Sequence, residues 1–101
     1  MKVYISGPIS NDSSYLIKFR RAETYLKKHG FEVVNPAKIL SHFPKNTEYV
    51  EYINMSLNLL DKCDVIYMLQ DWPDSCGARI EYVYACHKNM SIMYQNINEG
   101  A

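Results

Sequence analysis

The sequence has no excess charge of either sign, because eleven lysines and arginines are balanced by eleven aspartates and glutamates. A domain that binds nucleic acid normally carries a broad positive field that collects phosphates. We therefore expect no nucleic acid polymer as a partner. Long apolar runs are also missing: no window approaches the roughly 20 apolar residues that span a bilayer, and residues 1–10 hold no apolar core of a signal peptide. These absences predict a soluble, cytoplasmic protein that does not contact a membrane.

Patterns for metals, disulfides and common cofactors are lacking as well. The cysteines are odd in number and their spacing matches neither a zinc site nor a disulfide framework, so we expect reduced thiols at Cys63, Cys76 and Cys86. The three histidines have no metal-ligand spacing, and no metal site is predicted. The patterns G-x-G-x-x-G and G-x-x-x-x-G-K-[ST] are absent, which excludes the usual NAD and ATP motifs. No cofactor is predicted.

The composition that is present suits one globular domain: the chain has 101 residues, of which 48% are apolar and 22% charged. We predict a single domain over residues 1–101. Short apolar or β-branched segments indicate strands at 2–6, 31–35, 64–69 and 90–94. Apolar residues at helical spacing indicate helices at about 13–29, 48–62 and 78–88. Candidate N-cap residues for the first helix are Asn11, Asp12 and Ser13, and residues 37–47 are predicted as a loop with room for one short helical turn.

This alternation of strands and helices predicts an α/β fold. Short connections favour right-handed crossovers, and so a small doubly wound, flavodoxin- or Rossmann-like parallel sheet of four strands with three main helices. The segment 64–69 is nearly all apolar, as expected of a central strand covered on both faces. Such sheets bind ligands beyond the carboxyl ends of their strands. The loops that qualify are 7–12, 35–47 and 70–77.

The loop after the expected central strand carries unusual side chains for a surface connection. Trp72 could lay its indole face on a base or sugar, or could equally cover the edge of the sheet. Asp71 offers a carboxylate at the same place. Asp74 and Ser75 could bind a ligand or cap the next helix.

Glu81 follows this loop and is the main candidate for chemistry. We place it in the first turn of the next helix, where the helix dipole alone would favour a negative charge. Ala78 and Ala85 leave room beside it on the same face, and Gly77 lets a ligand approach helix N–H groups that suit a phosphate or another anion. The carboxylate could attack an electrophilic sugar carbon or hold a ribose hydroxyl. Both uses imply a sugar.

Three residues in or directly after the first strand complete the candidates. Gly7 and Pro8 form either a simple turn or a loop that holds backbone near a ligand, and their position favours the ligand. Among nine tyrosines we single out Tyr4, which lies in the first strand near the expected crevice. Asp64 is a weaker candidate because it starts its strand, at the end of the sheet opposite the expected ligand crevice.

Four motifs in this order resemble the nucleoside 2-deoxyribosyltransferase-like superfamily. They are Tyr-Ile-Ser-Gly-Pro at 4–8, Val-Val-Asn-Pro at 33–36, Cys-Asp-Val at 63–65 and Ser-x-Gly-x-x-x-Glu at 75–81. The likeness is greatest to a small bacterial and phage branch that opens on a Gly-Pro-Met-type loop, and it covers nearly the whole chain. It implies a nucleotide or nucleoside as ligand, Glu81 as the nucleophile toward C1′ of the sugar, Ser75 as a phosphate contact and Tyr4 as part of the pocket. It also implies a homodimer or higher homo-oligomer in which the partner chain completes the pocket.

One departure from the family pattern affects the expected activity. The family carries an aspartate eight residues before Asp64, where this chain has Ser56. A serine does not replace a carboxylic acid, so protonation of a departing base would fall to Asp71 or Asp74 or would not occur. General acid assistance is typically worth about 10² to 10⁴ in rate. The leading hypothesis is cleavage or transfer of an N-glycosidic bond through Glu81; the alternatives are a non-catalytic nucleotide sensor or sequestering protein of phage or defence type, and a structural dimer module.

Overall fold

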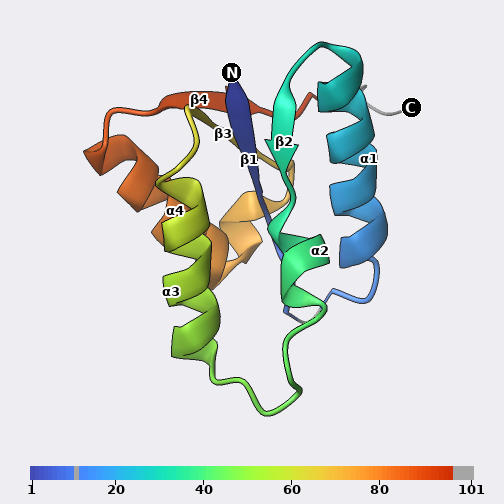
Figure 1. Ribbon diagram of the computed structural model, residues 1–101, viewed down its shortest axis with the longest axis vertical. Coiled ribbons are helices and arrows are strands. Elements are labelled where there is room, and N and C mark those ends of the chain that lie inside the picture. Colours follow the sequence, from blue (N-terminus) through green and yellow to red (C-terminus); the bar gives the residue numbers. More distant parts are fainter. Residues whose placement is uncertain (11, 97–101) are drawn as a thin grey trace.

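The computed structural model describes residues 1–10 and 12–96 and contains a parallel four-stranded sheet (Figure 1). The strands are β1 (Lys2–Ser6), β2 (Glu32–Val34), β3 (Val65–Met68) and β4 (Ser91–Tyr94), in the spatial order β2-β1-β3-β4. Every adjacent pair is parallel. The predicted doubly wound α/β fold is therefore confirmed; β1 has the predicted bounds, and the other three strands are one or two residues shorter than expected.

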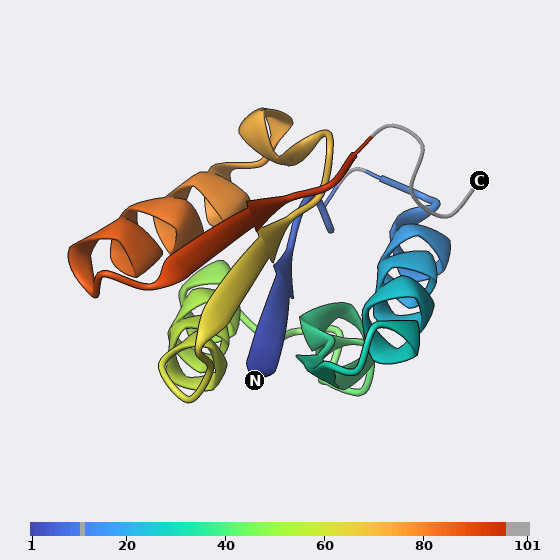
Figure 2. The same ribbon diagram turned by 90° about the horizontal axis from the view of Figure 1, so that it is seen from above.

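Helices cover both faces of this sheet. They are α1 (Tyr15–Lys28), α2 (Pro36–Leu40), α3 (Tyr49–Leu60) and α4 (Cys76–His87), with a single 3₁₀ turn, η1 (Trp72–Asp74), before α4. Figure 2 shows α3 and α4 on one side of the sheet and α1 and α2 on the other. This arrangement follows from right-handed crossovers, because the chain winds one way from β1 to β2 and the other way from β2 through β3 to β4.

Two helix starts differ from the sequence prediction for local reasons. Pro36 follows β2 and begins α2, where a proline is tolerated because its missing N–H is not needed. α4 begins at Cys76, because the Ser75 side chain caps it by accepting a hydrogen bond from the backbone N–H of Ala78 at 3.1 Å. Glu81 therefore lies in the second turn of α4 and not in the first. Its position is not explained by simple stabilisation of a helix end.

The start of α1 also shifts slightly. The predicted helix from residue 13 begins at Tyr15, and the Asp12 carboxylate accepts a hydrogen bond from the backbone N–H of Ser14 at 2.9 Å. Of the other expected N-cap residues, Asn11 lies outside the described residues.

The core consists of two apolar layers, one on each face of the sheet. Side chains alternate along a strand, so Val3 and Ile5 of β1 pack on the α1 side while Tyr4 packs on the side of α3 and α4. Ser6 shares the face of Tyr4 and lies at the carboxyl end of the strand. The amino end of the sheet is marked by Asp64, whose carboxylate accepts a hydrogen bond from the backbone N–H of Lys2 at 2.9 Å.

Within residues 1–10 and 12–96, none of the helices has the length and apolar character needed to cross a membrane.

Candidate functional site

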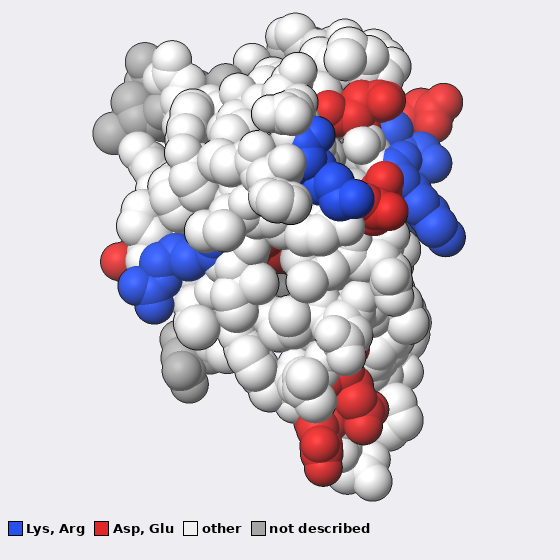
Figure 3. Space-filling model, turned by 90° about the vertical axis from the view of Figure 1, so that its left-hand side faces the viewer, with Lys and Arg blue, Asp and Glu red and all other residues white. Residues whose placement is uncertain are grey.

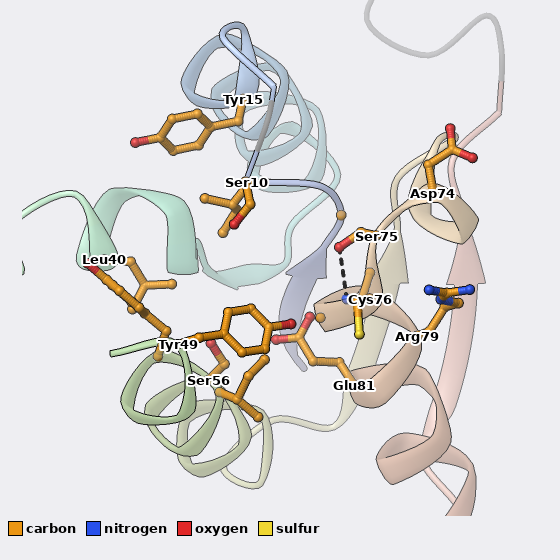
Figure 4. A pocket seen from close by; sticks show the side chains of 16 residues that line it. Ser10, Tyr15, Leu40, Tyr49, Ser56, Asp74, Ser75, Cys76, Arg79 and Glu81 are labelled. Atoms are coloured by element: carbon orange, nitrogen blue, oxygen red, sulfur yellow. Dashed lines mark hydrogen bonds between the residues drawn. The ribbon is translucent and has the colours of Figure 1, made fainter. Parts of the chain in front are cut away.

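A cavity of about 670 Å³ lies at the carboxyl ends of β1 and β3 (Figure 4). We call it the switch-point cavity, because β1 and β3 are the neighbouring strands from which the chain departs to opposite faces of the sheet. Its walls come from the loop after β1, the start of α1, the first half of α3 and the first turns of α4. Gly7, Tyr15, Tyr49, Ser56, Gly77 and Glu81 are among the residues that line it.

Glu81 lies deep in this cavity and is held by two side chains of β1. The Tyr4 hydroxyl donates a hydrogen bond to Oε2 of Glu81, and the Ser6 hydroxyl donates one to Oε1 at 2.7 Å. Tyr4 and Ser6 are two residues apart on the same face of the strand, so their donors reach the two oxygens of one carboxylate. Glu81 is only 6% exposed. Sequence reasoning selected Tyr4 and Glu81 but missed Ser6, whose only signal was its period-two spacing from Tyr4.

Burial dominates the electrostatics of Glu81. Loss of water raises its pKa from 4.5 to about 7, and the hydrogen bonds from Tyr4 and Ser6 act in the opposite direction. Among the residues that the structure describes, no lysine, arginine or histidine forms an ion pair with this carboxylate. Both the ionised and the protonated form are consequently populated near neutral pH.

Tyr4 stays a hydrogen-bond donor throughout this range. Burial, together with the charge of Glu81, raises the pKa of Tyr4 well above its ordinary value of 10. The nearby Ser56 hydroxyl lowers the pKa of Tyr4 in part. Ser56 lies beside this pair on α3, where it is 5% exposed and lines the cavity.

Tyrosines form much of the remaining wall. Figure 4 shows the ring of Tyr15 on one side of the cavity and that of Tyr49 on the other, and Tyr52 also lines it. Tyr52 is supported from behind by Phe43, with ring centroids 5.5 Å apart. The helical stripe 49–52–53–56–57–60 is predicted from the sequence to pack against the sheet. Its first four residues line the cavity instead, which the spacing alone did not reveal.

The first turn of α4 borders the cavity opposite α3. Ser75 and Gly77, both expected to contact a ligand, line it. A Cβ added to Gly77 would meet Ile53 Cδ1 and Tyr49 Oη at 3.5 Å each, which are ordinary contacts. Gly77 is therefore not required by packing, and its small size keeps this part of the wall open.

Gly7 and Pro8 differ in their relation to the cavity. Gly7 lines it, but a Cβ there would lie 2.6 Å from Leu69 Cδ1 and 2.9 Å from Leu69 Cβ. The glycine therefore lets the loop after β1 approach the residue that follows β3. Pro8 is buried and does not line the cavity.

Asp71 and Trp72, both predicted ligand contacts, lie outside the switch-point cavity. Trp72 stacks on Tyr82 with ring centroids 4.7 Å apart and packs against the core layer of α3 and α4, which was the alternative interpretation. The Asp71 carboxylate pairs with Lys18 at 2.8 Å, and Lys18 also pairs with Asp12. This ion-pair cluster ties the loop after β1 to the loop after β3. Asp71 instead lines a second cavity of about 500 Å³.

Acidic groups other than Glu81 are scarce at the cavity. Of the described lining residues, only Asp74 carries a second carboxylate, and Figure 4 shows its side chain pointing away from Glu81. The described residues contain no cluster of three or more histidine, cysteine, aspartate or glutamate side chains that could hold a metal ion.

The topology and the position of the cavity define a small doubly wound α/β protein with a ligand-site geometry at the switch point. A solved structure of a 2-deoxyribosyltransferase from the psychrotolerant bacterium Bacillus psychrosaccharolyticus has the same fold, with a TM-score of 0.75 at 19% identity over 97% of this chain and 77% of that one. This likeness supports the superfamily resemblance at the level of the fold. The branch with the N-terminal Gly-Pro-Met-type loop stays a prediction.

The chain belongs to the family described as domain of unknown function DUF4406, whose model matches residues 1–94. No curated protein matches the sequence.

Proposed function

We propose that this protein binds a nucleotide or nucleoside-like ligand in the switch-point cavity and cleaves or transfers its N-glycosidic bond, with Glu81 as the nucleophile. The observation that carries the proposal is the buried Glu81 carboxylate at the cavity, held by one hydrogen bond on each oxygen. The deoxyribosyltransferase-like fold supports a nucleoside-related ligand. We also keep the single domain over residues 1–101 as a prediction.

The hydrogen-bond geometry suits a nucleophile. Each oxygen of a carboxylate has two lone pairs, so one donor on each oxygen leaves a second lone pair free for attack on a carbon. Tyr4 and Ser6 fix the orientation of the Glu81 side chain, and a nucleophile held near its target gains from proximity. Tyr4 and Ser6 are positioning residues in this scheme.

The surrounding wall suits the rest of a nucleotide. Tyr15 and Tyr49 offer aromatic rings to a base or sugar. Ser75 and Gly77 lie at the N-terminal end of α4, where the positive end of the helix dipole favours a phosphate. These roles remain proposals for each residue separately.

A second candidate function is non-catalytic nucleotide binding, as in a sensor or a sequestering protein. It is favoured by Ser56, which lines the cavity at the position where the resembling family has a carboxylic acid. Without an acid, a neutral base departs slowly, and a bound nucleotide would stay intact.

Turnover separates the two candidates. The protein is incubated with deoxynucleosides, deoxynucleotides and dinucleotides of the NAD type, and free base is measured by chromatography. We expect base release that Glu81→Gln abolishes and that Glu32→Gln, an exposed control on β2, leaves unchanged. Tight binding of an intact ligand without release would contradict turnover and support the binder. If no ligand raises the melting temperature either, both candidates fail, because a ligand of the folded state stabilises it by mass action.

We further propose a homodimer, located in the cytoplasm. Exposed apolar side chains on α3 and α4 support an interface there: Val50, Met55, Ile80 and Val83. Figure 3 shows that this side of the molecule has few charged residues near its centre, with lysine, arginine and acidic side chains toward its margins. Apolar patches of this kind mark association surfaces.

A further inference from the structure

We propose that the substrate of the switch-point cavity is a cationic N-glycoside, a nucleoside whose base ring carries a positive charge, as pyridinium and 7-alkylpurinium nucleosides do. This inference rests on the proposed glycosidic function and specifies its substrate class. Two independent features of the described residues support it: none of them forms an ion pair with Glu81, and none is an acid placed to protonate a leaving base.

The first feature is the missing countercharge. A buried carboxylate normally pairs with a cation or forms enough hydrogen bonds to offset the loss of water. Glu81 has two neutral hydroxyl donors and, among the described residues, no ion-pair partner. Arg79 is the sole basic side chain among the described lining residues, and Figure 4 shows it pointing away from Glu81. A positively charged base would supply the partner that the described residues do not provide.

The second feature is the missing acid. When the base of an ordinary nucleoside leaves, it takes the bonding electrons and becomes an anion unless it is protonated. The described lining residues include no histidine or lysine, and the side chain of Asp74 points away from Glu81. The hydroxyls of Ser56 and Tyr4 are poor acids near neutral pH, since burial raises the pKa of Tyr4 further. Among the described lining residues, the site therefore offers a nucleophile without a carboxylic acid, histidine or lysine placed to protonate the leaving base.

A cationic base removes the need for that donor. The Glu81 carboxylate oxygen forms a bond to C1′, the bond from C1′ to the ring nitrogen breaks, and its electron pair neutralises the positive ring. The carboxylate and the cation become a neutral glycosyl ester and a neutral free base, and no proton moves. Water then attacks C1′ and releases the sugar, a proton and the Glu81 carboxylate.

The tyrosine walls agree with this substrate class. The face of an aromatic ring attracts a cation within about 6 Å of its centroid. Tyr15 and Tyr49 present rings on opposite sides of the cavity, and Tyr52 adds a third. A neutral base also stacks on tyrosine. The tyrosine wall therefore binds both kinds of base and attracts the cationic one more strongly.

A matched pair of substrates tests the inference. 7-Methylguanosine and guanosine differ by one methyl group and the positive charge that it introduces, and nicotinamide riboside is a second cationic probe. Base release is measured for each with the wild-type protein, with Glu81→Gln and without protein, and the rate without protein is subtracted. An acid that protonates the leaving base is worth about 10² to 10⁴ in rate for a neutral nucleoside and nothing for a cationic one. Without such an acid, we expect the protein-dependent rate for the cationic substrates to exceed that for guanosine by at least about 100-fold. Glu81→Gln should abolish it.

The outcomes distinguish the two levels of the proposal. Comparable protein-dependent rates for guanosine and 7-methylguanosine would overturn the cationic preference and leave the glycosidic function intact. Release of base from none of the probes, neutral or cationic, would overturn the glycosidic function as well.

The variant Ser56→Asp gives a separate test, because it places an acid beside Tyr4 at the cavity wall. It should raise release from guanosine while changing release from 7-methylguanosine less than about 3-fold. Equal changes for both substrates in a folded variant would contradict the role assigned to the missing acid. If this buried substitution prevents folding, the wild-type comparison of the two substrates decides the matter alone.

Discussion

The Ser6 hydroxyl donates a hydrogen bond of 2.7 Å to Oε1 of Glu81, which lies 75 residues later in the chain. Tyr4 binds the other oxygen of the same carboxylate. A strand and a helix from opposite ends of the sequence thus hold one buried acidic group at the switch point.

Removal of the Ser6 donor should raise the pKa of Glu81 above about 7, because its hydrogen bond favours the ionised form. In Ser6→Ala the rise of base release with pH should move to higher pH, since the nucleophile must be ionised. Carbon NMR of labelled glutamate carboxyls measures the pKa without any substrate. Ser91→Ala, an exposed serine on β4, should leave it unchanged. An unaltered Glu81 pKa in Ser6→Ala would contradict the positioning role.

Loss of the Tyr4 hydroxyl should act on the second oxygen of Glu81. Tyr4→Phe leaves Oε2 without its donor in a buried site, which we expect to cost about 1–3 kcal/mol of unfolding free energy at pH 8, where Glu81 is ionised. Urea denaturation measures this loss. Tyr84→Phe is the matched control, because its hydroxyl bonds to Asp61 at an exposed position and should cost less. Equal losses of unfolding free energy in the two variants would show that the hydrogen bond from Tyr4 to Glu81 contributes no more than an exposed hydrogen bond.

Stability should fall as the pH rises from 4.5 to about 7. The folded-state pKa of Glu81 is raised to about 7 from 4.5, so its contribution is fully present below pH 4.5 and is lost as the pH rises through about 7. The loss is on the order of 3 kcal/mol. Tyr4 and Tyr49, which face Glu81 from β1 and α3, have raised pKa values and stay neutral in this window.

Urea denaturation at a series of pH values measures this effect. Glu81→Gln should flatten the slope between pH 4.5 and 7, whereas Glu32→Gln should keep it. Asp12, with a pKa lowered to about 2, acts at lower pH in the opposite direction, since its stabilising effect is lost as the pH falls. If the unfolding free energy of Glu81→Gln still falls between pH 4.5 and 7, another titrating group causes the pH dependence.

Two glycines at the cavity should respond oppositely to alanine. Gly7→Ala places a Cβ 2.9 Å from Leu69 Cβ, an overlap that should destabilise the fold by about 1–3 kcal/mol. Gly77→Ala lies in α4 with ordinary contacts, and alanine is favoured over glycine in a helix by roughly 1 kcal/mol. It should therefore stabilise the fold while narrowing the cavity and weakening ligand binding. Thermal denaturation and ligand titration measure the two effects, and equal destabilisation by both variants would refute the distinction.

Val83 tests the proposed dimer. Its side chain is 66% exposed on α4, so Val83→Glu should hardly change the stability of a single chain. We expect sedimentation equilibrium to give the mass of two chains for the wild type and of one chain for the variant. Wild-type protein that sediments as a single chain would exclude the dimer. A dimer that survives the substitution would place the interface elsewhere.

Local sequence signals determined most of the fold. Short apolar segments and helical apolar spacing were enough to predict four parallel strands and three main helices, because these signals act between near neighbours. The start of α4 was placed too late. Ser75 was recognised as one possible cap, but only the hydrogen bond to Ala78 decided between capping and loop.

The sequence by itself also selected Glu81 and Tyr4 and left the use of Trp72 and Asp71 open. Tertiary structure decided that Trp72 stacks on Tyr82 and that Asp71 pairs with Lys18, both away from the switch-point cavity. It also brought Ser6 to Glu81. Periodicity specifies which face of a strand or helix a side chain occupies. Contacts between distant segments depend instead on how β1, β3, α3 and α4 pack. This packing gives Glu81 its neighbours and its burial, and both shift its pKa.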